Sequence, residues 1–143
     1  MESKYESKIK VVKASAEQIY AKLSDFSRLG EAMPQSLVKD WEATADDCHF
    51  SIDKLGRVGL KIVDREPGST VKYGLDGSLP LDMNLWVQVK EVGEGDSRLK
   101  VTMKADLNPM IKMVVGSKLQ QVVDQMADSM SRHNWDGGQT GNA

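Results

Sequence analysis

The chain has 143 residues, and its 19 Lys and Arg against 21 Asp and Glu give a net charge of -2 at pH 7. A chain of this length fits a single domain that can fold without a disulfide or a metal. The nearly balanced charge gives no electrostatic reason to expect nucleic acid or an anionic membrane as a partner. The one cysteine, Cys48, excludes an intrachain disulfide, and we expect a cytoplasmic protein.

The composition changes only near the C-terminal end. We therefore expect one domain over residues 1–134 and a flexible tail over residues 135–143, where glycine and polar residues predominate. No apolar run approaches the roughly 18 residues that cross a bilayer, so we expect no integral membrane insertion. The polar first residues also lack the apolar segment of a secretion signal.

The first element in chain order is a predicted strand over residues 5–13. Side chains alternate there, so that Tyr5, Ser7, Ile9 and Val11 share one face and lysines and glutamate share the other. Alternation of this kind is typical of a half-buried strand.

Two short helices are predicted next. Ser15 and Gln18 have the spacing of a capping box, which satisfies free backbone donors at a helix start. A second helical segment is expected over residues 26–33. It should end before Pro34, because the residue preceding a proline avoids the helical region.

From residue 37 to residue 107 the pattern is that of strands. Short apolar and polar alternations are separated by breaks that contain Gly or Asp, which favours antiparallel hairpins. The predicted strands lie within residues 37–45, 48–54, 57–68, 69–77, 81–96 and 97–107.

The last element is a long helix, with Asn108 as its N-cap, Pro109 at its first position and an end near Arg132. A stripe along one face is apolar and should face the sheet: Val115, Leu119, Val122, Val123, Met126 and Met130. This order of elements predicts an α+β helix-grip fold. In it, a curved antiparallel sheet of about seven strands wraps around the C-terminal helix, and two short helices follow the first strand.

Met110, Met113 and Val114 lie outside this stripe, at the start of the long helix. Three interpretations stay open. The short helices and loops near residues 33–37 cover these side chains, or the side chains border an apolar pocket, or they form a homodimer contact.

Few residues in the chain are suited to polar chemistry. The two histidines, His49 and His133, are expected in solvent, and no metal or cofactor motif occurs, so we expect neither a metal nor a cofactor. Cys48 begins a strand on its apolar face, which favours a buried, inert thiol. Tyr73 points inward and is a weak candidate for a catalytic residue.

The inward-facing residues of the predicted sheet and helix favour a cavity for a small hydrophobic molecule. A mostly apolar wall with a few polar groups is typical of such a site. The predicted ligand-binding residues are Trp41, Phe50, Tyr73, Met83, Leu85, Met103, Met113, Leu119 and Val123.

The segment from residue 9 to residue 34 resembles the start of the SRPBCC superfamily, which includes START-like, birch-pollen-allergen-like and polyketide cyclase/dehydrase proteins. The residues that carry the resemblance are Ala14, Ser15, Ala16, Glu17, Leu23, Ser24, Asp25, Phe26 and Pro34. It implies a START-like helix-grip domain with a hydrophobic cavity. It also implies roles from lipid or small-ligand binding to cyclisation of aromatic rings, and it carries over no catalytic residue.

Three functions follow as hypotheses. The first is a binder or carrier of a lipid, polyketide or aromatic molecule. The second is a polyketide cyclase/dehydrase-type enzyme with Tyr73 as general acid. The third is a co-chaperone-like protein-interaction domain that uses Met110, Met113 and Val114. The sequence leaves open whether the protein is an enzyme.

Overall fold

A computed structural model describes residues 2–77, 79 and 81–135. In this part of the chain, eight strands form one antiparallel sheet in the order β1-β8-β7-β6-β5-β4-β3, and β2 also pairs with β8. The strands are β1 (Glu2–Glu6), β2 (Lys10–Val12), β3 (Val38–Ala43), β4 (Asp47–Ile52), β5 (Gly56–Glu66), β6 (Thr70–Leu75), β7 (Asp82–Gly93) and β8 (Asp96–Asp106). The helices are α1 (Ala16–Leu23), α2 (Phe26–Leu29), the short 3-10 helix η1 (Gly30–Ala32) and α3 (Pro109–Arg132).

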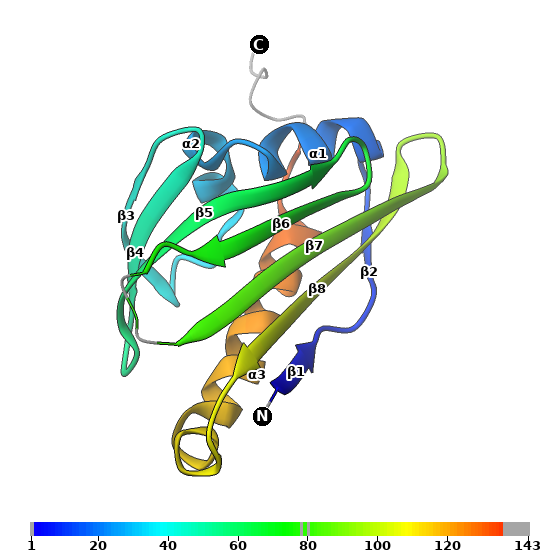
Figure 1. The fold of residues 1–143 in the computed structure, drawn as a ribbon. Coiled ribbons are helices and arrows are strands. Elements are labelled where there is room, and N and C mark those ends of the chain that lie inside the picture. Colours follow the sequence, from blue (N-terminus) through cyan, green and yellow to red (C-terminus); the bar gives the residue numbers. More distant parts are fainter. Residues whose placement is uncertain (1, 78, 80, 136–143) are drawn as a thin grey trace.

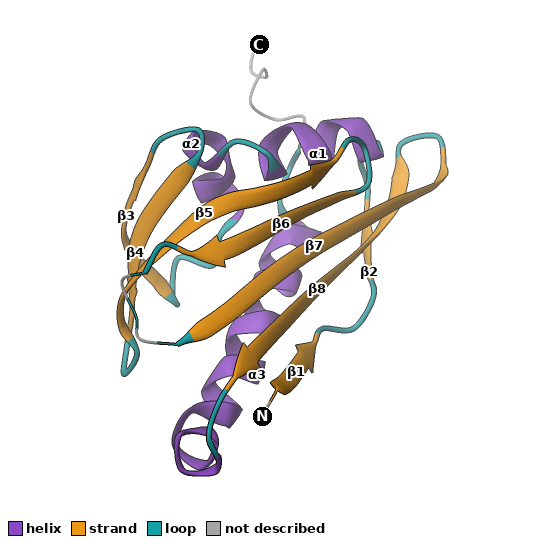
Figure 2. Cartoon of the chain, viewed as in Figure 1, coloured by secondary structure: helices purple, strands orange, loops and turns teal. Residues whose placement is uncertain are grey.

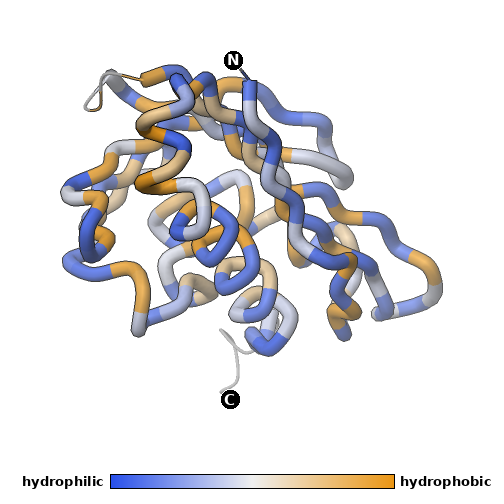
Figure 3. Tube along the Cα trace, turned by 90° about the horizontal axis from the view of Figure 1, so that it is seen from below, coloured by the Kyte–Doolittle hydropathy of each residue, from blue (hydrophilic) through white to orange (hydrophobic). Residues whose placement is uncertain are grey.

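The sheet curves around α3, and α1 and α2 lie across one end of it (Figures 1 and 2). Hydrophobic and hydrophilic residues alternate along the strands, as the tube in Figure 3 shows. The hydrophobic set faces α3, since Phe50, Leu85 and Val101 on three different strands are buried in one core with Val123 of the helix. The predicted helix-grip fold is therefore confirmed.

The predicted caps form as the sequence indicates. The Ser15 hydroxyl accepts a hydrogen bond from the backbone N–H of Gln18, and the Gln18 side chain accepts one from the backbone N–H of Ser15. At α3, the Asn108 side chain accepts from the backbone N–H of Ile111, and Pro109 occupies the first turn. These caps set where α1 and α3 begin, and so where α3 leaves the end of β8.

The prediction of a single strand over residues 5–13 is wrong. The segment divides into β1 and β2 because four steps along the chain from Glu6 to Lys10 lie opposite only three steps of β8, from Thr102 to Leu99. One extra residue moves every following side chain to the other face of the sheet. Ile9 and Val11, expected inward, are consequently exposed.

The apolar stripe of α3 packs on the sheet, but the start of the helix has no cover from the described residues. Met110, Met113 and Val114 are 76%, 87% and 76% exposed. The interpretation that the short helices cover these side chains is wrong, because α1 and α2 lie at the far end of α3 (Figure 1).

The packed region of the chain continues past α3. Trp135, which we expected to begin the tail, is buried, and its indole N–H donates to the carbonyl of Met130. Its ring meets that of His133 edge-on. Residues 136–143, the rest of the expected tail, lie outside the described residues.

His133 joins this C-terminal segment to α1. The buried Lys22 ammonium donates to Nε2 of His133 at 3.0 Å and also pairs with Glu31. Since an ammonium only donates, Nε2 must be the unprotonated acceptor of a neutral ring. Burial, and then the Lys22 charge, lower the pKa of His133, although Glu31 acts in the opposite direction.

This lowered pKa predicts that the fold loses stability in mild acid. The contribution of neutral His133 is complete above its ordinary pKa of about 6.5 and is lost as the pH falls towards the lower folded value. We therefore expect His133→Gln to show a smaller decrease in Tm between pH 7.5 and pH 5.5 than the wild-type protein. Thermal denaturation followed by circular dichroism measures the Tm of both proteins at the two pH values. Equal decreases in Tm would show that His133 is not the cause of the acid sensitivity.

Candidate functional site

An apolar cavity with a volume of about 220 Å³ lies between the concave face of the sheet and α3. Its wall comes from β4, β5, β7 and β8, from the loops that join them, and from α3. The lining residues are Phe50, Ile52, Lys54, Leu55, Val58, Leu60, Leu79, Leu81, Met83, Leu85, Met103, Leu107, Ile111, Val115, Leu119, Val122 and Met126.

The cavity has a buried floor and a more exposed mouth. Phe50, Leu60 and Leu85 are buried at the floor. The mouth lies where three segments meet: the turn between β4 and β5, the loop between β6 and β7, and the first turns of α3. Its partly exposed residues are Leu55, Leu79, Leu81, Ile111 and Val115.

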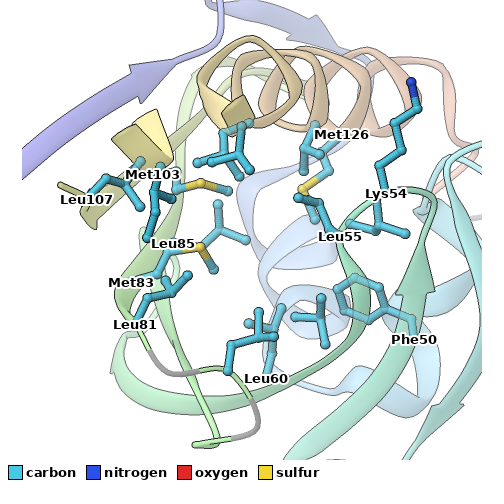
Figure 4. A pocket seen from close by; sticks show the side chains of 17 residues that line it. Phe50, Lys54, Leu55, Leu60, Leu81, Met83, Leu85, Met103, Leu107 and Met126 are labelled. Carbon is cyan, nitrogen blue, oxygen red and sulfur yellow. The ribbon is translucent and has the colours of Figure 1, made fainter. Parts of the chain in front are cut away.

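Among the described residues that line the cavity, Lys54 alone has a polar side chain. Figure 4 shows its side chain along the edge of the cavity, with the amino nitrogen pointing away from the other lining side chains. Lys54 is exposed and has a φ of 74°, in the left-handed region that a tight turn between β4 and β5 requires. The described lining residues therefore offer apolar contact and no pair of groups for acid–base chemistry.

The structure brings five of the nine predicted ligand-binding residues to this cavity: Phe50, Met83, Leu85, Met103 and Leu119. Trp41 and Tyr73 instead border a much smaller void nearer α2. Val123 is fully buried in the core and lines neither space, and Met113 lies on the outer surface of α3.

The phenol of Tyr73 has a structural partner. Its hydroxyl donates to the carbonyl of Leu23 at the end of α1, at 2.5 Å, and the side chain is fully buried. Burial raises the pKa of Tyr73 well above its ordinary value. A phenol that is used in this hydrogen bond and does not line the apolar cavity is poorly placed to protonate a ligand there.

Cys48 and His49, at neighbouring positions of β4, do not line the cavity. Burial raises the pKa of the Cys48 thiol to about 12, so the reactive thiolate is scarce at neutral pH. The ring of His49 lies on the opposite face of the sheet, 2.9 Å from a carboxylate oxygen of Asp76. Among the described residues, no group of His, Cys, Asp and Glu could hold a metal ion.

The sequence prediction missed Lys54, Leu55, Leu79, Leu81 and Ile111 at the mouth, and the buried Leu107 further inside. A signal for some of them exists, since Leu55 and Leu79 are apolar residues in turns, where polar residues are expected. Such residues normally contact something outside their own turn. Their meeting point with α3, however, depends on the curvature of the sheet.

A long helix inside a curved antiparallel sheet, with an apolar cavity between the two, defines the helix-grip class of proteins. The model of one family in this class, described as polyketide cyclase / dehydrase and lipid transport, matches residues 4–133. The chain belongs to this family, which confirms the resemblance to the SRPBCC superfamily. A sequence search of curated proteins found no match.

Solved structures with the same fold include norcoclaurine synthase from Thalictrum flavum, with a TM-score of 0.70, 13% identity and coverage of 92% of this chain and 86% of the other. The protein XoxI from Bacillus cereus has a TM-score of 0.68 at 12% identity, with coverage of 92% and 93%. An Aha1 dimer from Colwellia psychrerythraea has a TM-score of 0.63 at 17% identity, with coverage of 91% and 97%. At these identities the likeness concerns the fold alone. In the described part of the chain, no helix is long and apolar enough to span a membrane.

Proposed function

We propose that the protein binds a small hydrophobic molecule in the cavity between the sheet and α3, and acts as a binder or carrier. The observation that carries the proposal is the wall itself, in which 16 of the 17 lining residues are apolar and Lys54 turns its charge outward. Family membership supports it, because the family description includes lipid transport. We place this activity in the cytoplasm, where the unpaired thiol of Cys48 stays reduced.

The size of the cavity narrows the class of ligand. An apolar cavity of about 150 Å³ holds one benzene molecule. A cavity of about 220 Å³ therefore suits a substituted single aromatic ring or an aliphatic segment of similar volume. A longer molecule must extend through the mouth between Leu55, Leu81 and Ile111.

Apolar burial should supply most of the affinity. A ligand of one ring buries roughly 200 Å² at about 25 cal/mol per Å², which contributes about 5 kcal/mol. Without further polar contacts, this corresponds to a Kd of roughly 0.1–1 mM. We therefore expect one-ring probes to bind weakly and natural ligands to bind more tightly by filling the mouth as well.

Narrowing the cavity from α3 tests the proposal. Val115 is half-buried and lines the cavity near its mouth, so a phenylalanine there occupies space that a ligand needs. We expect Val115→Phe to weaken the binding of ethylbenzene and 1-octanol roughly tenfold or more. Amide NMR titrations measure the affinity, and the shifted signals report where each probe binds.

The matched control is Val114→Phe, the same substitution one position earlier, on the exposed face of α3. This variant should bind both probes like the wild-type protein. The proposal is overturned if the wild-type protein binds neither probe, or if the two variants bind both probes equally well.

A further inference from the structure

The first turns of α3 project beyond the end of the sheet, below β1 and β8 in Figure 1. We call residues 109–114 the α3 tip. Met110, Met113 and Val114 of this tip are more exposed than any other large apolar side chain in the described part of the chain, with Met113 at 87%. Methionine is flexible and polarizable, so it suits an irregular apolar environment.

The α3 tip is continuous with the mouth of the cavity. Ile111 belongs to both, since it lines the cavity and is 42% exposed. Val115, one turn after Ile111, continues the same wall inward. Leu79 and Leu81 border the mouth from the opposite side. A surface that covers the α3 tip would therefore also face the entrance to the cavity.

The charges of the α3 tip are compatible with an apolar environment. The first turn of α3 contains no acidic residue, and Lys112 is the only charged residue of the tip. A lysine can keep its ammonium in the headgroup layer while its apolar stem lies deeper. Residues 109–114 themselves therefore bring no carboxylate into lipid.

The exposed area of the α3 tip indicates whether its binding partner is a membrane or a second copy of the chain. The exposed side chains present on the order of 500 Å², the size of the largest apolar patch on an ordinary monomer. A stable protein interface buries about 800 Å² on each partner and is broad and flat enough to pack. A narrow projecting tip does not meet that need, whereas an interfacial helix needs only to enter roughly 5–10 Å into a bilayer.

From these features we propose that the α3 tip docks on a lipid bilayer and so presents the mouth of the cavity to the membrane. Docking places Met110, Met113 and Val114 at the boundary between headgroups and acyl chains. The bilayer is then the source or the destination of the hydrophobic ligand. This last role rests on the proposed function, but docking itself requires no ligand.

Co-sedimentation with phosphatidylcholine vesicles tests the docking. Apolar contact drives it, so we expect the wild-type protein to bind these uncharged vesicles and to do so equally at low and high salt. The double variant Met113→Ser, Val114→Ser should lower the partition coefficient roughly tenfold. Both positions are exposed, so we expect the fold to be retained, with circular dichroism as the check.

Two further variants make the outcome specific. Val92→Ser removes an exposed apolar residue from the hairpin between β7 and β8, at the opposite end of β8 from the α3 tip, and should leave vesicle binding unchanged. Val115→Phe should bind vesicles as the wild-type protein does, although its affinity for ethylbenzene and 1-octanol is lowered. A failure of docking and a failure of ligand binding are therefore distinguishable.

Three results would overturn the docking proposal. The first is a wild-type protein that does not bind the vesicles. The second is a tip variant that binds them as strongly as the wild-type protein does. The third is a wild-type protein that sediments as a dimer while the same double variant sediments as a monomer. That result would assign the α3 tip to a contact with a second copy of the chain.

Discussion

Replacing Phe26 by alanine is expected to lower the free energy of unfolding by about 3–5 kcal/mol, as is typical of a buried phenylalanine. Phe26 begins α2 and is almost fully buried. Its ring centroid lies 5.1 Å from that of Tyr73 and 6.2 Å from that of Trp41. The substitution therefore opens a hole where the short helices meet the sheet.

Urea unfolding and thermal unfolding measure this loss. For a domain of this size the Tm should fall by roughly 10–15 °C, and the dependence of stability on urea should keep its slope because the unfolded surface changes little. Phe26→Leu is the matched control, since it keeps most of the apolar volume and should lose less than about 1.5 kcal/mol. An alanine variant within about 1 kcal/mol of the wild-type protein would contradict the packing described for Phe26.

The parts of the fold that depend on neighbours in sequence were predictable. The capping box at Ser15 and the Asn108–Pro109 helix start need only residues within one turn, and both form as expected. The division of the first strand was not predictable, because the extra residue between β1 and β2 appears only against the register of β8. Periodicity assigns faces correctly until a bulge exchanges them.

The candidate site was predictable only as a face of the sheet. Alternation places Tyr73 and Leu85 correctly inward, and both are buried. It does not tell how far along the sheet each residue lies, so it could not separate Tyr73, beneath α1 and α2, from Leu85 in the cavity wall. The mouth depends further on loops such as the one that carries Leu79, whose position no local pattern specifies.

A second large effect is expected for Gly30→Ala, where the sign of the change in the free energy of unfolding tests the packing around residue 30. Gly30 has ordinary helical dihedral angles, φ -53° and ψ -32°. In that conformation alanine normally stabilises a protein by about 0.4–1 kcal/mol. A Cβ at residue 30, however, would lie 2.5 Å from Nε1 and 2.8 Å from Cδ1 of Trp41.

Trp41 cannot move away easily, because its ring stacks on Phe50 at 5.5 Å and contacts Phe26 on another side. We therefore expect Gly30→Ala to destabilise the protein by about 1–3 kcal/mol, the usual cost of an overpacked core. The control is Gly116→Ala in α3, where the nearest atom to a new Cβ is the Tyr5 hydroxyl oxygen at 3.4 Å, an ordinary contact. This second variant should gain up to about 1 kcal/mol from helix propensity. Opposite signs in urea unfolding would support the contact between Gly30 and Trp41, and a stabilised Gly30→Ala variant would show that the indole does not pack against the backbone of residue 30.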